Sequence, residues 1–102
     1  MGYFHLRLVP PRPTFPFDIT EAEGKAMTDH AVYWRKLADD GHAIAVGPVF
    51  DPKGAFGLAI VETENEAEAE ALAAADPVGR AGLGFRWEVA PMPSIILRDA
   101  KD

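Results

Sequence analysis

The stretch that decides the fold is TEAEGKAMTDHAVYWRKLADDG, residues 20–41. Thr20 and Glu23 have the spacing of a capping box, in which two side chains bond backbone N–H groups at the start of a helix. The apolar stripe that follows has helical spacing and consists of Met27, His30, Ala31, Trp34, Leu37 and Ala38. Gly41 is a typical helix stop. The segment predicts one amphipathic helix with His30 on its inward side.

Short apolar segments around this helix predict four strands. They lie at residues 3–9, 43–49, 56–62 and 85–90. In the first, Phe4, Leu6 and Leu8 form one face, and His5 and Arg7 lie on the other. This period of two is typical of a strand with one buried face.

The connections complete the order of elements. Residues 10–17 are rich in proline, which excludes a helix there and makes them a strand-to-helix link. The turn residues of FDPKGA, residues 50–55, predict a hairpin loop. Asn65 and Glu68 begin a second helix. Its inward residues are expected to be Ala67, Ala71, Leu72, Ala74 and Ala75.

The order β-α-β-β-α-β predicts a ferredoxin-like α+β fold. Right-handed crossovers place both helices on one face of an antiparallel sheet and leave the other face open. We expect one domain over residues 1–102, with a core at about 3–92 and a tail at 93–102 that adds an edge strand or packs on a partner. We also expect a homodimer in which the open sheet faces of two copies pair.

Composition excludes several function classes. The chain has 102 residues, of which 48% are apolar and 25% charged, as in a folded domain. Its net charge of -6 disfavours binding to the negative backbone of nucleic acids. No segment approaches the roughly 18 apolar residues of a membrane span. We expect a cytoplasmic protein without a signal peptide.

Metal and cofactor signals are missing from the sequence. The chain has no cysteine, which excludes disulfides and thiolate catalysis. His5, His30 and His42 lack the spacing of zinc ligands, and no glycine-rich phosphate loop is present. We therefore expect neither a metal nor a cofactor.

Two polar residues are expected at one end of this fold, His30 from the first helix and Asp76 from the turn after the second. An Asp76 carboxylate on one imidazole nitrogen would fix the tautomer and raise the basicity of the other nitrogen. His30 lies about ten residues into its helix, roughly 15 Å from the start, which opposes this contact unless the regular helix begins nearer Lys25 or the Asp-Pro turn folds inward. The alternatives are that His30 is a packing residue and that Asp76 is a helix N-cap.

A family resemblance is carried by short motifs along nearly the whole chain. They are Met27 to Leu37, Gly41, Gly47-Pro48-Val49, Asp51, Gly54, Asp76-Pro77 and Val89 to Met92. Together they resemble the YCII-related domain family over about residues 3–92. The resemblance implies a dimeric ferredoxin-like fold, related to the dimeric α+β barrels. It also implies an active site built on a histidine–aspartate pair, which falls on His30 and Asp76.

Substrate contacts are predicted from residues that surround this pair or line the open sheet face. The candidates are His5, Arg7, Tyr33, Trp34, Gly47, Pro48 and Asp51. The first function hypothesis is an enzyme that uses His30 and Asp76 for general acid/base chemistry on a small organic molecule, as a lyase, an isomerase or a dehalogenase-like enzyme. The alternative is a dimeric module that binds a small ligand or supports a partner protein without chemistry.

Overall fold

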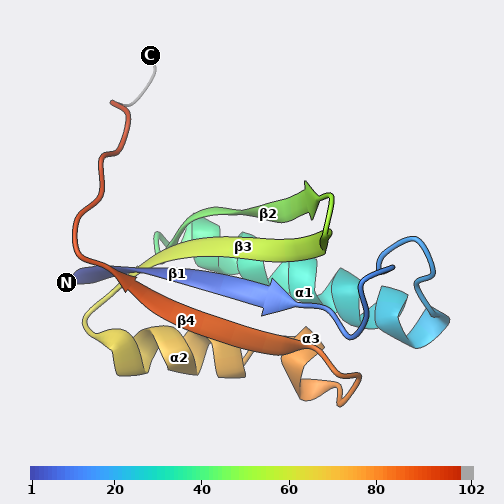
Figure 1. Cartoon of the computed structure of the whole chain (residues 1–102). Helices are drawn as coiled ribbons and strands as arrows, with labels where there is room; N and C mark the ends of the chain where they lie inside the picture. The colour runs from blue at the N-terminus through green and yellow to red at the C-terminus, as the bar shows by residue number, and fades with distance from the viewer. Residues whose placement is uncertain (100–102) are drawn as a thin grey trace.

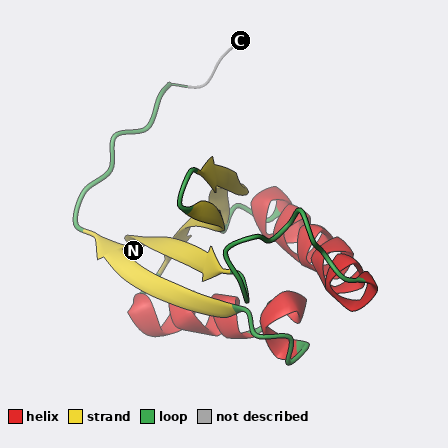
Figure 2. Cartoon of the chain, turned by 45° about the vertical axis from the view of Figure 1, so that its right-hand side comes forward, coloured by secondary structure: helices red, strands yellow, loops and turns green. Residues whose placement is uncertain are grey.

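The computed structural model describes residues 1–99. The elements run in the order β1 (Gly2–Val9), α1 (Glu21–Asp39), β2 (Ala43–Asp51), β3 (Gly54–Thr63), α2 (Glu66–Ala74), α3 (Pro77–Arg80) and β4 (Arg86–Met92). Neighbouring strands pair antiparallel in the spatial order β2-β3-β1-β4 (Figure 1). The helices pack on one face, and the other face is open (Figure 2). The ferredoxin-like prediction is confirmed. Residues 100–102, which end the predicted tail, lie outside the described residues.

Alternation along the strands decides which side chains face the helices. In β1, Phe4, Leu6 and Leu8 are buried on the helix side. Two of their partners on β3 are small, since Leu6 lies opposite Ala59 and Leu8 lies opposite Gly57. Small side chains at these positions leave room between the sheet and α1 toward the end of β1.

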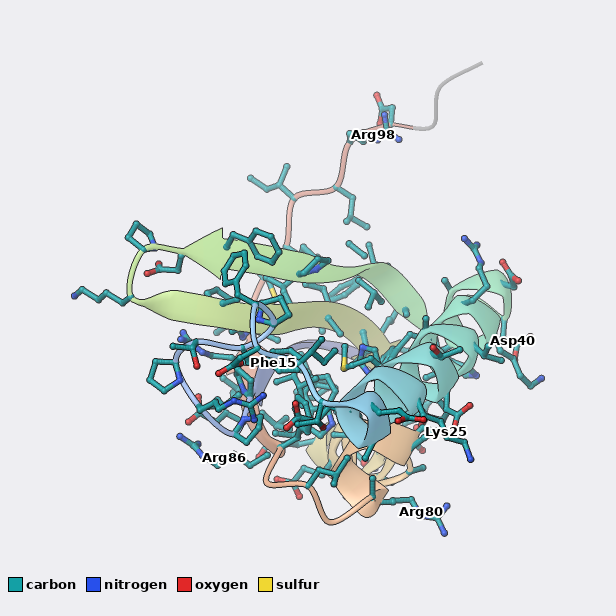
Figure 3. The ribbon with its side chains drawn as sticks, turned by 90° about the vertical axis from the view of Figure 1, so that its right-hand side faces the viewer. Phe15, Lys25, Asp40, Arg80, Arg86 and Arg98 are labelled. Atoms are coloured by element: carbon teal, nitrogen blue, oxygen red, sulfur yellow. The ribbon has the colours of Figure 1, made fainter. Side chains whose placement is uncertain are left out.

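Apolar side chains fill the rest of the layer between sheet and helices (Figure 3). One cluster includes Leu6, Trp34 and Val61 and packs the helices against the middle of the sheet. A second cluster includes Phe15 and Phe85, whose rings meet edge-on at a centroid distance of 5.2 Å. The proline-rich connector therefore contributes to the core through Phe15.

The predicted capping box at the start of α1 is present. The Glu23 backbone N–H donates to Thr20 Oγ1 at 3.1 Å, and the Thr20 backbone N–H donates to Glu23 Oε1 at 2.9 Å. Glu23 is buried and also accepts two hydrogen bonds from the Arg12 guanidinium, each 2.7 Å long. Arg12 donates as well to the backbone oxygen of Asp18 at 2.8 Å. One carboxylate thus joins the connector to the helix start.

Replacing Glu23 with glutamine should reduce the loss of thermal stability that the protein shows as the pH falls. The hydrogen bonds from Arg12 lower the pKa of Glu23 from 4.5 to about 2. Glu23 therefore contributes stability that is present above pH 4.5 and is lost as the pH falls from 4.5 toward about 2. The thermal unfolding midpoint of the wild-type chain should approach that of Glu23→Gln over this range. Glu21→Gln, at an exposed position, is the control. If the unfolding midpoints of the wild-type chain and Glu23→Gln stay equally far apart over this pH range, the assignment is contradicted.

The expected hairpin loop at residues 50–55 is shorter in the structure. Pairing between β2 and β3 continues to Asp51 and Gly54, so that Pro52 and Lys53 alone form the turn. The Asp51 side chain accepts a hydrogen bond from the Lys53 backbone N–H at 2.8 Å. Gly54 has a φ of +138°, which side chains rarely adopt. The turn residues were identified correctly, but the strands extend further toward them than predicted.

The buried face of α2 also differs from the prediction. Ala69 and Ala73 are buried, whereas Ala67, Ala71 and Ala74 are exposed. Alanine occurs all around this helix, so its pattern gives no contrast between inner and outer faces. The packing of α2 against the sheet decides the face instead.

The outer face of α1 is charged, as expected for an amphipathic helix at the surface. Arg35 pairs with Asp39 and Lys36 pairs with Asp40, each four residues apart. Among residues 1–99, no helix has the length and apolar character that crossing a membrane requires.

Candidate active site

Asp76 is the centre of the polar site and is fully buried. It caps α3, because its Oδ1 accepts a hydrogen bond from the Val78 backbone N–H at 2.9 Å. Its Oδ2 accepts from His30 Nδ1 at 2.6 Å and from Trp34 Nε1 at 2.7 Å. Both earlier interpretations of Asp76 are therefore present at once, since one oxygen caps a helix and the other bonds the histidine.

The fold brings Asp76 to the middle of α1, although α1 begins at Glu21 as its cap predicts. Only Ala75 and Asp76 separate α2 from α3, and α3 packs against α1. His30 and Trp34 are four residues apart, so both point from one side of α1 toward the same carboxylate oxygen. The inward fold of this turn removes the 15 Å obstacle that the helix length suggested.

The hydrogen bonds of Asp76 predict the tautomer of His30. An ionised carboxylate only accepts hydrogen bonds, so we expect His30 Nδ1 to donate the third bond to Asp76. Burial and then the charge of Asp76 raise the pKa of the nearby Tyr33 hydroxyl. His30 Nε2 is left free of this pair.

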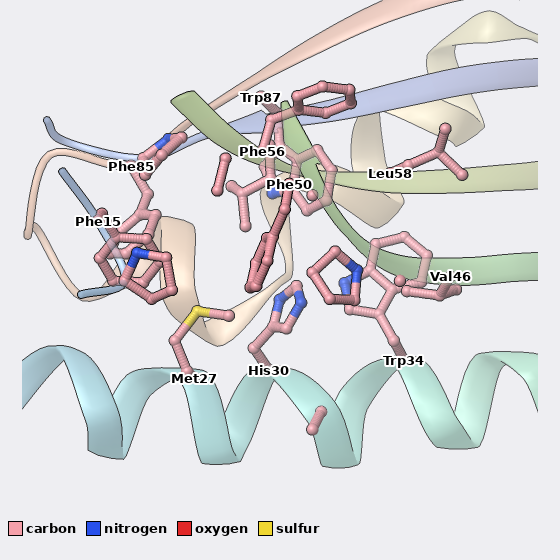
Figure 4. A pocket seen from close by; sticks show the side chains of 18 of the residues that line it. Phe15, Met27, His30, Trp34, Val46, Phe50, Phe56, Leu58, Phe85 and Trp87 are labelled. Atoms are coloured by element: carbon pink, nitrogen blue, oxygen red, sulfur yellow. The ribbon is translucent and has the colours of Figure 1, made fainter. Parts of the chain in front are cut away.

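A cavity of about 730 Å³ lies between α1 and the sheet, and His30 lines it (Figure 4). The side chain of His30 is 13% exposed. Among the described residues the wall is mostly apolar and rich in aromatic rings, which belong to Phe15, Trp34, Phe50, Phe85 and Trp87. The Trp87 ring lies nearly parallel to the imidazole, at 24° and a centroid distance of 6.4 Å.

Small residues of β3 explain why the cavity exists. Ala55 and Gly57 line it, and the inner face of β3 carries no large side chain at these positions. A Cβ added at Gly57 would lie 3.1 Å from the Leu8 Cβ, so this position tolerates no bulk. The side chains of β3 therefore do not fill the space below α1.

His30 is the main candidate for chemistry in this cavity. The other ionisable residue in the described wall is Arg35, whose guanidinium is held by Asp39 at 2.5 and 3.1 Å. Over residues 1–99, no group of three or more His, Cys, Asp and Glu side chains could hold a metal ion. The arrangement suits proton transfer at His30 Nε2 to or from a largely apolar ligand.

Three predicted contact residues lie at the cavity. Trp34, Gly47 and Pro48 line its wall, and Trp34 also bonds Asp76. Tyr33 does not line it, because its hydroxyl turns toward α2 and donates to the Leu72 backbone oxygen at 2.6 Å. Asp51 belongs to the turn between β2 and β3 rather than to the cavity wall.

His5 and Arg7 lie on the opposite face of the sheet. They alternate along β1 with residues that face the helices, so strand geometry directs them away from His30. Arg7 covers the ring of Phe56 at 4.0 Å. The structure therefore separates these two candidates from the histidine–aspartate pair.

Apart from Trp34, sequence reasoning did not assign the aromatic wall of the cavity. In the last strand Phe85, Trp87 and Val89 alternate with Arg86 and Glu88, and this period of two is a signal that could have indicated Trp87. Phe15 precedes Pro16 in the proline-rich connector, and Phe50 was expected in the hairpin loop, so no periodicity indicated a direction for either ring. Their roles in the wall follow from tertiary packing.

The two tryptophans should differ in their effect on stability when each is replaced with phenylalanine. Trp34 Nε1 donates to a buried carboxylate, and a hydrogen bond to a charged group contributes about 1.5–3 kcal/mol. The Trp87 Nε1 is buried and has no partner among the described residues, so its removal loses no hydrogen bond. Urea unfolding should show that Trp34→Phe lowers the free energy of unfolding by at least about 1.5 kcal/mol more than Trp87→Phe. Equal losses would contradict the predicted contribution of the Trp34–Asp76 bond.

Comparisons with known proteins agree on family and fold. A family model described as YCII-related domain matches residues 3–93. The uncharacterized protein TM1266 from Thermotoga maritima has a similar structure, with a TM-score of 0.52 and 16% identity over 88% of this chain and 94% of that chain. A second similar structure is that of 5-chloro-2-hydroxyhydroquinone dehydrochlorinase (TftG) from Burkholderia phenoliruptrix AC1100, solved with 2,5-dihydroxybenzoquinone. Its TM-score is 0.55, with 19% identity over 85% of this chain and 90% of that chain. These identities show a shared fold alone. No curated protein sequence matches the chain.

Proposed function

Because the chain belongs to the YCII-related domain family, we propose that it is an enzyme in which His30, oriented by Asp76, transfers a proton on a small organic substrate. One observation carries the proposal. The imidazole has one nitrogen bonded to a buried carboxylate at 2.6 Å, while its ring lines a cavity large enough for a substrate. This is the geometry of a general acid/base whose tautomer is set.

The chemistry follows from the two nitrogens of His30. Nε2 takes a proton from an acidic C–H or O–H of the substrate, and the resulting imidazolium is stabilised by Asp76 through Nδ1. In an isomerisation the same proton returns at another atom. In an elimination the electron pair of the broken C–H bond forms a double bond, the leaving group departs with its own bonding pair, and the proton passes from Nε2 to water. Both reactions balance without an oxidant or a metal.

The cavity wall suggests the class of substrate. Its aromatic and aliphatic side chains favour a flat, mostly apolar molecule, with the acidic group directed at His30. TftG, a dehydrochlorinase with this fold, was solved with 2,5-dihydroxybenzoquinone. We therefore propose hydroxylated or halogenated aromatic and quinone-like compounds as the first substrates to screen.

A screen with two variants tests the proposal. Thermal shift with such compounds should identify ligands, and turnover should be followed by absorbance and by mass spectrometry. Val46→Trp should fill the cavity and weaken binding at least about tenfold. His30→Gln should keep binding and lose turnover. Ligands that bind without chemistry in the wild-type chain would instead support the non-catalytic binding module.

We propose in addition that two copies pair through their open sheet faces. Phe56, Leu58 and Ile60 of β3 are half-buried, and alternation directs them to that face. A homodimer would cover these apolar side chains. Leu58→Asp should place a charge in the interface and give a monomer in sedimentation, with a native circular dichroism spectrum. A dimer that survives Leu58→Asp would contradict this choice of face.

A further inference from the structure

Most of the exposed large apolar side chains among residues 1–99 form two groups. The first, here called the mouth group, consists of Ile19, Ile44, Val46 and Phe50, which are exposed and line the cavity, and of Phe17, whose ring neighbours that of Phe50. Phe17 and Phe50 are 83% and 65% exposed, and their rings lie 6.0 Å apart. Apolar residues gathered at one opening are typical of a surface that another chain segment covers.

The second group lies on the segment after β4. Ile96 is 99% exposed and Leu97 is 49% exposed, and this segment, residues 93–99, leaves the body of the domain (Figure 1). Ile95, Ile96 and Leu97 form an apolar run in which Ile95 is half-buried and the other two are exposed. Exposure of these side chains costs free energy that burial against a partner would recover.

The segment starts far from the mouth group of its own chain. β4 and β2 are the opposite edges of the sheet. Met92, the last residue of β4, pairs with Tyr3 at the start of β1, whereas Phe50 of β2 is near the other end. β1 alone has eight residues, about 26 Å at roughly 3.3 Å per residue. The same segment of a second copy does not have to cross this sheet to reach the mouth group.

We propose that residues 95–97 of one copy cover the mouth group of a second copy. The inference rests on the proposed homodimer and on the cavity of the proposed function. A two-fold pair exchanges both segments, so one rotation covers both openings and buries both apolar runs. The partner then contributes Ile96 and Leu97 to the wall of the site and excludes water from the space around His30.

Disulfide trapping tests the exchange, since the chain has no cysteine of its own. Ile96→Cys and Phe50→Cys, carrying different tags, are co-expressed and oxidised. We expect a disulfide-linked heterodimer in at least about tenfold higher yield than with Ile96→Cys and Ala75→Cys, an exposed site at the end of α2. A yield equal to this control would overturn the proposal. So would a disulfide formed within one chain when Ile96→Cys and Phe50→Cys are combined.

A second variant separates this inference from the proposals on which it rests. Ile96→Asp combined with Leu97→Asp should weaken the dimer at least about tenfold in sedimentation while the monomer fold is kept. A dimer that Leu58→Asp dissociates, but that the double variant leaves unchanged, overturns the exchange and leaves the paired sheets standing. A monomeric wild-type chain at micromolar concentration overturns both. Trapping is read on a gel, so loss of the catalytic proposal would not affect it.

Discussion

His30→Gln should lower kcat/KM by about 100-fold to 10,000-fold while the chain stays folded, because general acid/base catalysis by one side chain contributes an effect of this size. Glutamine has a similar reach, and its amide N–H can still donate to Asp76. It cannot take up a proton at neutral pH. The rate is measured on the substrate found by the screen, and urea unfolding reports on the fold of the variant.

Tyr33→Phe is the matched control for this variant. Tyr33 also lies on α1 and bonds a distant residue, but its hydroxyl donates to the Leu72 backbone oxygen and does not line the cavity. Its turnover should stay within a few-fold of the wild-type rate. Full activity of His30→Gln would contradict the proposed role of His30, whatever the activity of Tyr33→Phe.

Asp76→Ala should lower the free energy of unfolding by about 3–5 kcal/mol. The carboxylate is fully buried and accepts hydrogen bonds from His30 Nδ1, Trp34 Nε1 and the Val78 backbone N–H. Alanine leaves three buried donors without this acceptor, and each unsatisfied buried group costs about 1–3 kcal/mol, partly offset where water enters. Urea unfolding of the purified variant measures the loss directly.

The control for Asp76→Ala is an aspartate that makes no such contacts. Asp29 is exposed, and its substitution by alanine should change the free energy of unfolding by no more than about 0.5 kcal/mol. Asp76→Asn keeps the shape of the side chain and one acceptor oxygen, so its loss should fall between the two. An Asp76→Ala loss below about 1 kcal/mol would contradict the central place of this carboxylate in the packing of α1 and α3.

Local patterns predicted the parts of the fold that depend on local chemistry. Alternation in β1 identified its buried face, and Thr20 with Glu23 identified the start of α1, because each signal acts within a few residues. The chain order then placed His30 and Asp76 at one end of the domain. Their contact itself depends on how α3 folds against α1, which no local pattern describes.

Features that depend on distant residues could not be predicted in the same way. Arg12 and Glu23 are eleven positions apart, and nothing in their spacing indicates a bidentate ion pair. The cavity depends on Gly57 opposite Leu8, a matter of strand register rather than of sequence pattern. His5 and Arg7 were grouped with the site although their alternation in β1 already directs them to the other face.

The tautomer of His30 is the measurement that tests the account most directly. It needs no substrate, since a long-range ¹H–¹⁵N spectrum of the labelled protein identifies which ring nitrogen of His30 carries the proton in the neutral form. The account predicts a proton on Nδ1, donated to Asp76, and a bare Nε2 that shifts when a cavity ligand is added. A proton on Nε2 in the neutral ring would contradict it, because the nitrogen available to the cavity could then not act as the base.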